Sequence, residues 1–233
     1  MSWWALLAAV VALVGILISF LTGPFQAPIA DKAGDHRVAH LLGVGWHPTP
    51  RAAAAAALEW ANVTGADMMY ELGCGDGVVA VEALHRGAKA VCVERDPAMA
   101  ILAEAAMRPF GGRARVEVAD LFEFDLSDAT VVFTFLLPDM NARLRATSFT
   151  RLRPGTRVIS REFDILGWPC GKRFRHSGVK FLMWQLPVPA EPLLSALRPA
   201  EDMHEVSYDE DAAVEHMLEC GAAESAESDE EVS

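Results

Sequence analysis

Hydrophobic and polar positions divide the chain into stretches of different character. The first is an apolar run from Trp3 to Leu21, in which seventeen of nineteen residues are apolar. A middle stretch alternates short apolar runs with segments whose apolar residues recur at helical spacing, and a final stretch scatters apolar residues among acids. We therefore predict an anchor at residues 1–22, a linker at 23–45, a folded domain at 46–189 and a tail at 190–233.

The apolar run at residues 3–21 predicts a transmembrane helix. At 1.5 Å per residue it spans about 28 Å, close to the hydrocarbon thickness of a bilayer. A cleaved signal peptide is the alternative, but it requires basic residues before the run and a small-residue cleavage site after it, and the sequence offers neither. Lys32, Arg37 and Arg51 all follow the run. The positive-inside rule therefore predicts a single-pass membrane protein whose folded domain lies on the cytoplasmic side.

The middle stretch alternates predicted strands with predicted helices. The strands fall at residues 67–72, 88–93, 113–118, 129–137 and 156–160, with two more near Phe174 and at 179–186. The helices fall at residues 51–62, 78–86, 97–107 and 140–152. Alternation predicts a parallel sheet covered on both faces, and the last two strands, with no helix between them, predict an antiparallel pair at one end. We expect an α/β fold with a Rossmann-like, seven-stranded, mostly parallel sheet, plus one N-terminal transmembrane helix.

Charge is distributed unevenly along the chain. The formal net charge is −12. Residues 190–233 hold 14 acids and one arginine, which gives −13, so residues 1–189 carry +1. The acidic tail is poor in aromatic residues, and we expect it to be largely disordered. A nearly neutral domain disfavours a nucleic-acid partner, which would require a basic surface.

Cysteines and histidines show no recognisable ligand spacing. Cys74, Cys92, Cys170 and Cys220 are widely separated and form no CxxC pair. We therefore predict neither a zinc site nor a disulfide framework, and a reducing compartment fits this usage. The seven histidines form no metal-ligand pattern either, so we predict no metal site.

The clearest chemical motif is the glycine-rich turn that follows the first predicted strand and opens the first helix after it. It runs from Glu71 through Gly73, Cys74 and Gly75 to Gly77. Glycines let the backbone turn sharply and let a ligand approach closely, and the start of a helix favours an anionic group. A lone G-x-G-x-G can also be a purely structural turn.

Two acids at the ends of the next strands favour a binding role. Glu94 lies 21 residues after Gly73, at the end of the second strand, where a carboxylate can accept hydrogen bonds from both ribose hydroxyls. Asp120 follows the third strand and can accept one from an adenine amino group, with Leu121 and Phe122 as apolar walls. Together these features predict a nucleoside-binding site.

Two nucleoside cofactors fit such a site. In the NAD fingerprint the third glycine comes one residue later than here, and Glu71 would repel a pyrophosphate. The pattern resembles instead the class I S-adenosylmethionine-dependent methyltransferases, whose signature is an acid followed by G-x-G-x-G. The resemblance covers about residues 46–187. It implies S-adenosylmethionine as cofactor, with Glu71 and residues 73–77 at its methionine part, Glu94 at the ribose and Asp120 at the adenine.

Further motifs resemble one group within that class. They are His-Pro-Thr-Pro at residues 47–50, Phe-Leu-Leu-Pro-Asp-Met-Asn at 135–141, Arg-Pro-Gly-Thr-Arg-Val-Ile-Ser at 153–160, and Trp184. The group contains the membrane-anchored protein-lysine methyltransferases that modify the mitochondrial adenine nucleotide translocase and the ATP synthase c subunit, together with prokaryotic relatives. Cys74 stands where this group more often has Ser or Thr. The candidate cofactor-binding residues are Thr49, Glu71, Gly73, Cys74, Gly75, Gly77, Glu94, Asp120, Leu121 and Phe135.

Methyl transfer from a sulfonium needs a nucleophile about 3–3.5 Å from the methyl carbon and in line with the leaving sulfur. The fourth predicted strand ends near the sheet edge where ligands bind. There Asp139 and Asn141 are the polar candidates for orienting an amine, and a helix cap is the alternative for Asp139. Small-molecule N-methyltransferases often carry Asn/Asp-Pro-Pro-aromatic at this point. Its absence argues against an exocyclic base amine as substrate.

Residues 139–180 hold ten basic residues and three acids. One explanation is that these charges are simply exposed to solvent. Another is that they form a surface that binds anionic lipid headgroups or the acidic tail.

The sequence as a whole predicts methyl transfer to a lysine of a membrane protein. Methylation of a membrane-resident quinone or lipid, or a noncatalytic nucleoside-binding scaffold, are the alternatives.

Overall fold

The computed structural model describes residues 47–188 and Cys220. The predicted anchor, the predicted linker and all of the acidic tail except Cys220 lie outside these residues. Seven strands form one sheet in the order β3-β2-β1-β4-β5-β7-β6. The strands are β1 (Met68–Leu72), β2 (Lys89–Glu94), β3 (Ala114–Val118), β4 (Val131–Thr134), β5 (Arg157–Arg161), β6 (Lys172–His176) and β7 (Val179–Gln185). The helices are α3 (Arg51–Trp60), α4 (Val78–His85), α5 (Pro97–Met107) and α6 (Pro138–Ala146), with 3₁₀ turns η1 (Arg108–Arg113) and η2 (Phe149–Arg151).

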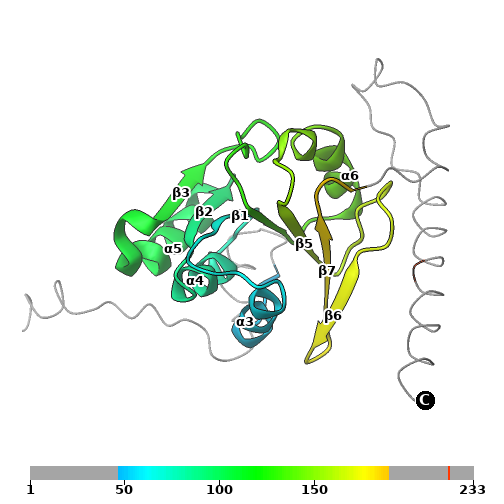
Figure 1. The fold of residues 1–233 in the computed structure, drawn as a ribbon. Helices are drawn as coiled ribbons and strands as arrows, with labels where there is room; N and C mark the ends of the chain where they lie inside the picture. Colours follow the sequence, from blue (N-terminus) through cyan, green and yellow to red (C-terminus); the bar gives the residue numbers. More distant parts are fainter. Residues whose placement is uncertain (1–46, 189–219, 221–233) are drawn as a thin grey trace, which may run out of the picture.

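The strand directions confirm the predicted mixed sheet. Strands β3, β2, β1, β4 and β5 are parallel to one another, while β7 is antiparallel to both β5 and β6. The chain builds outward from β1 through β2 to β3 and then returns to place β4 on the other side of β1 (Figure 1). Such a reversal leaves a crevice at the carboxyl ends of β1 and β4, where open α/β sheets bind ligands.

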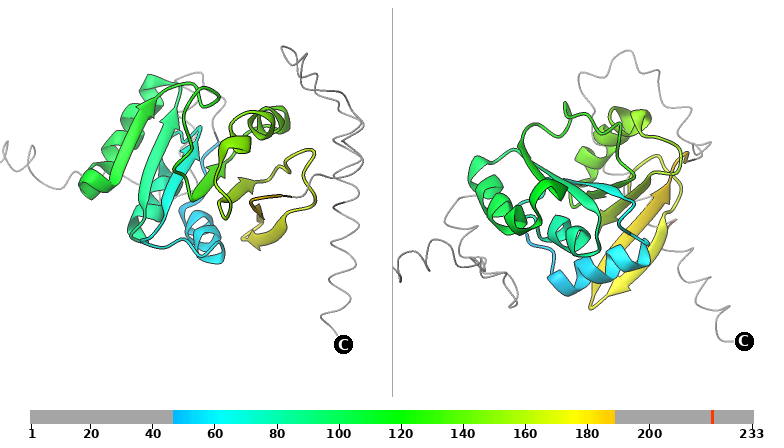
Figure 2. Two further views of the ribbon diagram at one scale, coloured as in Figure 1. Left: turned by 45° about the horizontal axis from the view of Figure 1, so that its top comes forward. Right: turned by 60° about the vertical axis from the view of Figure 1, so that its left-hand side comes forward.

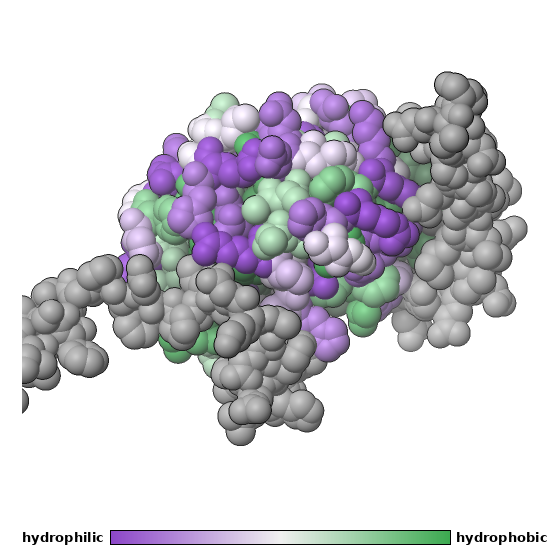
Figure 3. Space-filling model, turned by 90° about the horizontal axis from the view of Figure 1, so that it is seen from below, coloured by the Kyte–Doolittle hydropathy of each residue, from purple (hydrophilic) through white to green (hydrophobic). Residues whose placement is uncertain are grey.

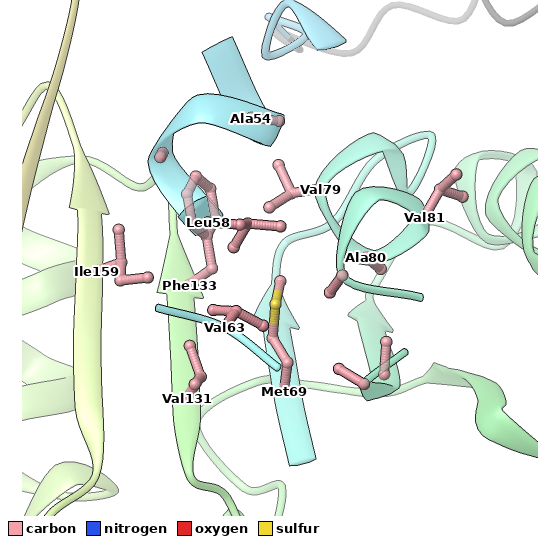
Figure 4. Close-up of a cluster of buried hydrophobic side chains, with 14 of the residues drawn as sticks. Ala54, Leu58, Val63, Met69, Val79, Ala80, Val81, Val131, Phe133 and Ile159 are labelled. Carbon is pink, nitrogen blue, oxygen red and sulfur yellow. The ribbon is translucent and has the colours of Figure 1, made fainter. Parts of the chain in front are cut away.

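Two apolar clusters hold helices against opposite faces of the sheet. On one face α3, α4 and α5 pack against side chains that include Met69 and Phe133. Figure 4 shows Leu58 of α3 and Val79 of α4 lying over these strands. On the other face α6 and η2 pack against side chains that include Val132. Helices therefore cover both faces, as the alternation of strands and helices predicts (Figure 2).

Two predicted elements differ from the observed ones at the carboxyl edge of the sheet. The predicted strand at residues 129–137 ends at Thr134, and the predicted helix at 140–152 begins at Pro138 and ends at Ala146. Proline at the first helical position lacks only an N–H that the helix does not use there, so α6 begins two residues early. Thr147, which bonds its hydroxyl back to the Arg143 carbonyl at 2.8 Å, follows the last helical residue.

The prediction of no disulfide framework is wrong. Cys74 is bonded to Cys92 and Cys170 to Cys220, each with a Cα–Cα distance of 5.5 Å. Cys74 follows β1 and Cys92 lies on the neighbouring strand β2, so sheet pairing brings together residues 18 apart in sequence. The spacing of cysteines along the sequence gives no sign of a pair that forms because two strands are neighbours in the sheet. The cysteines therefore no longer favour a reducing compartment.

The described surface mixes hydrophilic and hydrophobic residues, with a group of hydrophobic residues near the middle of the face in Figure 3. Within residues 47–188, none of the helices has both the length and the apolar character needed to cross a membrane. The predicted anchor at residues 3–21 lies outside the range to which that finding applies.

Candidate active site

A cavity of about 470 Å³ lies at the carboxyl edge of the sheet. One part of its wall, which includes Glu71, Cys74 and Asp76, comes from the end of β1 and the turn that follows. Another part comes from residues 135–137, which follow β4, and from Phe163, which follows β5. His47 and Thr49 lie on the wall from the segment before α3. The cavity thus has an acidic part and an apolar part, contributed by different strand ends.

The glycine turn has the backbone that the sequence predicts. Gly73, Gly75 and Gly77 have φ angles of 68°, 56° and 74°, in the left-handed region that side chains disfavour. A Cβ on Gly77 would come within 3.1 Å of the Ala103 Cβ. The Gly73 N–H donates to the Val93 carbonyl at 2.9 Å, which fixes the turn against β2. Close approach and left-handed backbone together explain why this segment is rich in glycine.

Glu71 is a buried acid on the cavity wall. Its Oε2 accepts a 2.7 Å hydrogen bond from the Ala80 N–H in the first turn of α4. Burial raises the pKa of Glu71 well above its usual range, and the charges of Asp76 and Glu94 raise it further. Within the described part of the chain, none of these three acids forms an ion pair with a basic side chain. Such a site suits a ligand that carries positive charge.

Glu94 lies beside the turn, as its spacing predicts. Its Oε2 accepts from the Gly75 N–H and its Oε1 from the Asp96 N–H, both at 2.9 Å. Each carboxylate oxygen has two lone pairs, so both retain capacity for a second donor such as a ribose hydroxyl. Glu94 therefore shapes the turn beside the cavity, while its own side chain does not line the cavity.

The adenine candidates lie one strand further along the same edge. The Ala119 N–H donates to the Glu94 carbonyl at 3.1 Å, which places the segment after β3 beside Glu94. Asp120 is exposed and its Oδ1 accepts from the Phe122 N–H at 2.9 Å, while Leu121 is buried. Of the ten cofactor-binding candidates, five line the cavity and five do not. Those that line it are Thr49, Glu71, Gly73, Cys74 and Phe135, and those that do not are Gly75, Gly77, Glu94, Asp120 and Leu121.

Neither predicted catalytic residue lines the cavity. Asp139 is exposed in the first turn of α6, whose cap position is Leu137, so Asp139 is not the cap either. Asn141 is fully buried and donates from Nδ2 to the Leu136 carbonyl at 3.3 Å and to the Ser160 hydroxyl at 3.4 Å. Two positions along a helix turn the side chain by about 200°, so the two candidates face different surroundings.

Sequence reasoning missed two residues that the structure brings to the site. Phe163 lines the cavity, and Arg161 places its guanidinium carbon 4.0 Å from the centre of the Phe135 ring. In the sequence alone, Arg161 is one of ten basic residues in the stretch 139–180. The Thr49 hydroxyl, just before α3, accepts from Arg161 Nη1 at 3.1 Å. The sequence feature that could have identified Phe163 and Arg161 is their position, because both lie at or just after the end of the parallel strand β5.

Among the described residues, no group of three or more His, Cys, Asp or Glu side chains is placed to hold a metal ion. The cavity suits an organic cofactor with a cationic end. Glu71 supplies a buried carboxylate there, and the glycines, which carry no side chain, let a ligand approach the backbone of the turn closely.

Comparison with known proteins identifies that cofactor. The ANTKMT methyltransferase domain matches residues 71–172. A protein-lysine N-methyltransferase of Saccharolobus islandicus is 38% identical over 129 residues, which is 54% of this chain and 80% of that protein. The chain belongs to the ANTKMT family of class I methyltransferases. It is therefore an S-adenosylmethionine-dependent methyltransferase, and the cofactor predicted from the acid and glycine turn is confirmed.

Two further relatives show how varied the acceptors of similar proteins are. An RNA methyltransferase of Salinibacter ruber, solved with S-adenosylhomocysteine, superposes with a TM-score of 0.57 at 34% identity, covering 68% of this chain and 99% of its own. A ribosomal protein L11 methyltransferase of Cupriavidus metallidurans is 33% identical over 51% of this chain and 38% of its own length. The methyltransferase fold is therefore shared among proteins named for different substrates.

Proposed function

We propose that this methyltransferase transfers a methyl group to the side-chain amine of a lysine in a membrane protein. The observation that carries the proposal is the composition of the cavity. An acidic part at Glu71 suits the cationic cofactor, and an apolar part at Phe135, Leu136 and Phe163 suits a four-methylene side chain. The likeness to a protein-lysine N-methyltransferase supports the same acceptor.

Cofactor binding is proposed to use four sets of groups. Glu71 accepts a hydrogen bond from the amino group of the cofactor's methionine part. The glycine turn lies along the carboxylate of that methionine part. Glu94 accepts from the ribose hydroxyls while it keeps its bonds to the turn. Asp120 accepts from the adenine amino group, with Leu121 as an apolar wall.

The protein's part in the reaction is to orient and desolvate the amine. When bound, the cofactor supplies an electrophilic methyl group on a sulfonium. The lone pair of the amine nitrogen forms the new C–N bond as the C–S bond breaks, and the proton lost from nitrogen passes to water. A lysine amine has a reference pKa near 10.4, and an apolar channel lowers that pKa because burial disfavours the charged form. The wall around Phe135 and Phe163 provides such a channel.

The membrane part of the proposal rests on the sequence. Residues 3–21 are long and apolar enough to span a bilayer, and the basic residues that follow favour a cytoplasmic catalytic domain. An anchor of this kind would keep the cavity near lysines of membrane proteins. The Leu-Pro-Asp sequence at residues 137–139, in place of Asn/Asp-Pro-Pro-aromatic, argues against a base amine.

The test is transfer of radiolabelled methyl groups. We would incubate the full-length protein in detergent with labelled S-adenosylmethionine and with membranes and soluble extract of the cells that encode it. Label in protein, released as methyllysine on acid hydrolysis and concentrated in the membrane fraction, is the expected result. Label in the lipid extract or in RNA, or none above a Glu94→Ala control, would each contradict the proposal in a different way.

A further inference from the structure

Two aromatic rings form the apolar part of the cavity. Phe135 follows β4 and Phe163 follows β5, and both line the cavity. Their ring centres are 6.4 Å apart and their planes differ by 16°. The two residues are 28 positions apart in sequence, so only the pairing of β4 with β5 brings them together. This near-parallel pair is called the aromatic wall below.

The chain makes an unusual turn to bring Phe163 into the aromatic wall. Glu162 has a φ of 64°, in the left-handed region that a non-glycine residue rarely adopts. Strand β7 holds it there, because the Glu162 N–H donates to the Lys180 carbonyl at 3.0 Å and the Lys180 N–H donates to Glu162 Oε1 at 3.3 Å. Unfavourable backbone of this kind persists where the surroundings enforce it, and it concentrates at functional sites.

A second support reaches Phe163 through buried side chains. The Ser160 hydroxyl donates to the Phe163 carbonyl at 2.6 Å and accepts from Asn141 Nδ2 at 3.4 Å. Asn141 Nδ2 also donates to the Leu136 carbonyl at 3.3 Å. Asn141 therefore connects the segment that carries Phe135 and Leu136 to the segment that carries Phe163. Its place in the fold is behind the aromatic wall.

Arg161 supports the other ring. Its guanidinium carbon lies 4.0 Å from the centre of the Phe135 ring, and its Nη1 donates to the Pro48 carbonyl at 3.0 Å and to the Thr49 hydroxyl at 3.1 Å. Its side chain is only 12% exposed. A planar guanidinium can stack on a ring and donate from its edge at the same time, which an ammonium cannot do. Arg161 thus joins the segment before α3, the aromatic wall and the end of β5.

We propose that Phe163 determines which methyl acceptors the cavity admits, and that Arg161 is the positioning residue that holds the aromatic wall in place. The inference rests on the proposed function, because it names the surface that takes the hydrocarbon chain of the lysine. Two aromatic faces remove water from four methylene groups, and they also attract the amine whenever it carries a charge. A branched or short acceptor would leave part of the wall uncovered.

The first test measures binding of n-butylamine, which reproduces the lysine side chain. The full-length protein in detergent, saturated with S-adenosylhomocysteine, is titrated at pH 9 and binding is followed by saturation-transfer NMR. We expect Phe163→Ala to weaken binding at least tenfold, and Phe163→Leu to weaken it less because an apolar surface remains. Phe110→Ala is the matched control, since Phe110 is a half-buried ring beside Arg113 and away from the cavity.

The second test separates positioning from stability. Arg161→Gln and Arg161→Lys should each weaken n-butylamine binding about tenfold, because neither side chain can stack on Phe135 and bond Thr49 together. Arg153→Gln, at an exposed arginine just before β5, should leave binding unchanged. Unfolding temperatures are measured for every variant. With a lysine acceptor in hand, the Arg161 variants should raise KM for the acceptor more than they lower kcat.

The outcomes distinguish the inference from the proposed function. If the wild-type protein does not bind n-butylamine, or if Phe163→Ala binds it as the wild-type protein does, the inference is wrong. If the Arg161 variants bind it like Arg153→Gln, the positioning role is wrong. If n-butylamine binding depends on Phe163 but labelled methyl groups never reach lysine, the proposed function fails while the aromatic wall stands as an amine-binding surface.

Discussion

Polar side chains at the two ends of the parallel strands differ in how fully they are hydrogen-bonded within the protein. At the amino end, Asp67 Oδ1 accepts from the Thr130 hydroxyl at 2.7 Å and from Arg157 Nη2, and Asp67 Oδ2 accepts from the Thr64 N–H at 2.8 Å. Arg157 Nη1 donates to the Asn62 carbonyl at 2.8 Å. These groups satisfy one another within the protein.

At the carboxyl end several buried polar atoms lack such partners. Within the described residues, Thr134 Oγ1, Asn141 Oδ1, Arg161 Nε and Asp164 Oδ1 make no hydrogen bond. Glu71 has no basic partner there and its pKa is raised by burial, whereas hydrogen bonds from Thr64, Thr130 and Arg157 outweigh burial and lower the pKa of Asp67. Unsatisfied polar groups cost stability. The comparison indicates that polar groups at the amino end stabilise the fold, whereas the carboxyl end, where the cavity lies, leaves polar groups unsatisfied within the protein.

The largest effect is expected at the amino end. Arg157→Met leaves the buried Asp67 carboxylate without its cation, which should lower the free energy of unfolding by about 3 kcal/mol. Denaturant unfolding monitored by circular dichroism measures this change. Binding of S-adenosylhomocysteine, measured by calorimetry below the unfolding temperature, should stay within twofold of wild type. A loss of cofactor affinity without a loss of stability would break the distinction between the two ends.

The next largest effect is expected at Glu94. Glu94→Ala removes both proposed ribose hydrogen bonds, and two bonds to a charged group are worth enough to weaken S-adenosylhomocysteine binding about 100-fold. Calorimetric titration measures the dissociation constant. Glu117→Ala, at a half-exposed acid in β3 that pairs with Arg115, is the control and should bind normally. Normal binding by Glu94→Ala would show that the ribose lies elsewhere.

Glu71→Gln should raise the stability of the protein and weaken its binding of S-adenosylhomocysteine. Burial raises the pKa of Glu71 in the folded protein well above the 4.5 of the unfolded chain, so this residue costs stability as pH rises above 4.5. Glutamine removes that cost and should raise Tm at pH 7 by about 2–4 °C. It should also weaken S-adenosylhomocysteine binding about tenfold.

Calorimetry offers a sharper form of the same prediction. If the cofactor amino group draws Glu71 into its ionised form, binding releases a proton, and the measured enthalpy varies with the ionisation enthalpy of the buffer. Glu71→Gln should abolish that variation. An unchanged buffer dependence in the variant would place the released proton on another group.

The smallest effects come from one substitution made at both ends. Thr156→Val, before β5 at the amino end, removes a 3.0 Å hydrogen bond to the Ala129 carbonyl and should cost about 1 kcal/mol. Thr134→Val, at the carboxyl end of β4, removes a buried hydroxyl that makes no hydrogen bond and should be neutral or slightly stabilising. Chemical denaturation of the pair measures the difference. Equal costs at both positions would contradict the comparison.

Local features of the fold were predictable from sequence. The strands, the helices and the turn at residues 73–77 depend on residues close together in the chain, and α5 begins and ends at its predicted residues. The positions of Glu71 and Glu94 at one edge of the sheet were predictable because the ends of adjacent parallel strands meet there, and their roles in binding stay predictions. The membrane anchor at residues 3–21 stays a prediction, since it lies outside the described residues.

The sequence alone determined the order of the elements, the glycine turn and the acids beside it, because helical and strand periodicity and left-handed backbone leave marks in short stretches. Only the tertiary structure decided that Cys74 pairs with Cys92, that Asn141 is buried, that Phe163 lines the cavity and that Arg161 stacks on Phe135. These outcomes depend on which strand ends become neighbours and which way the chain turns after each strand. A single sequence carries little local trace of such long-range packing.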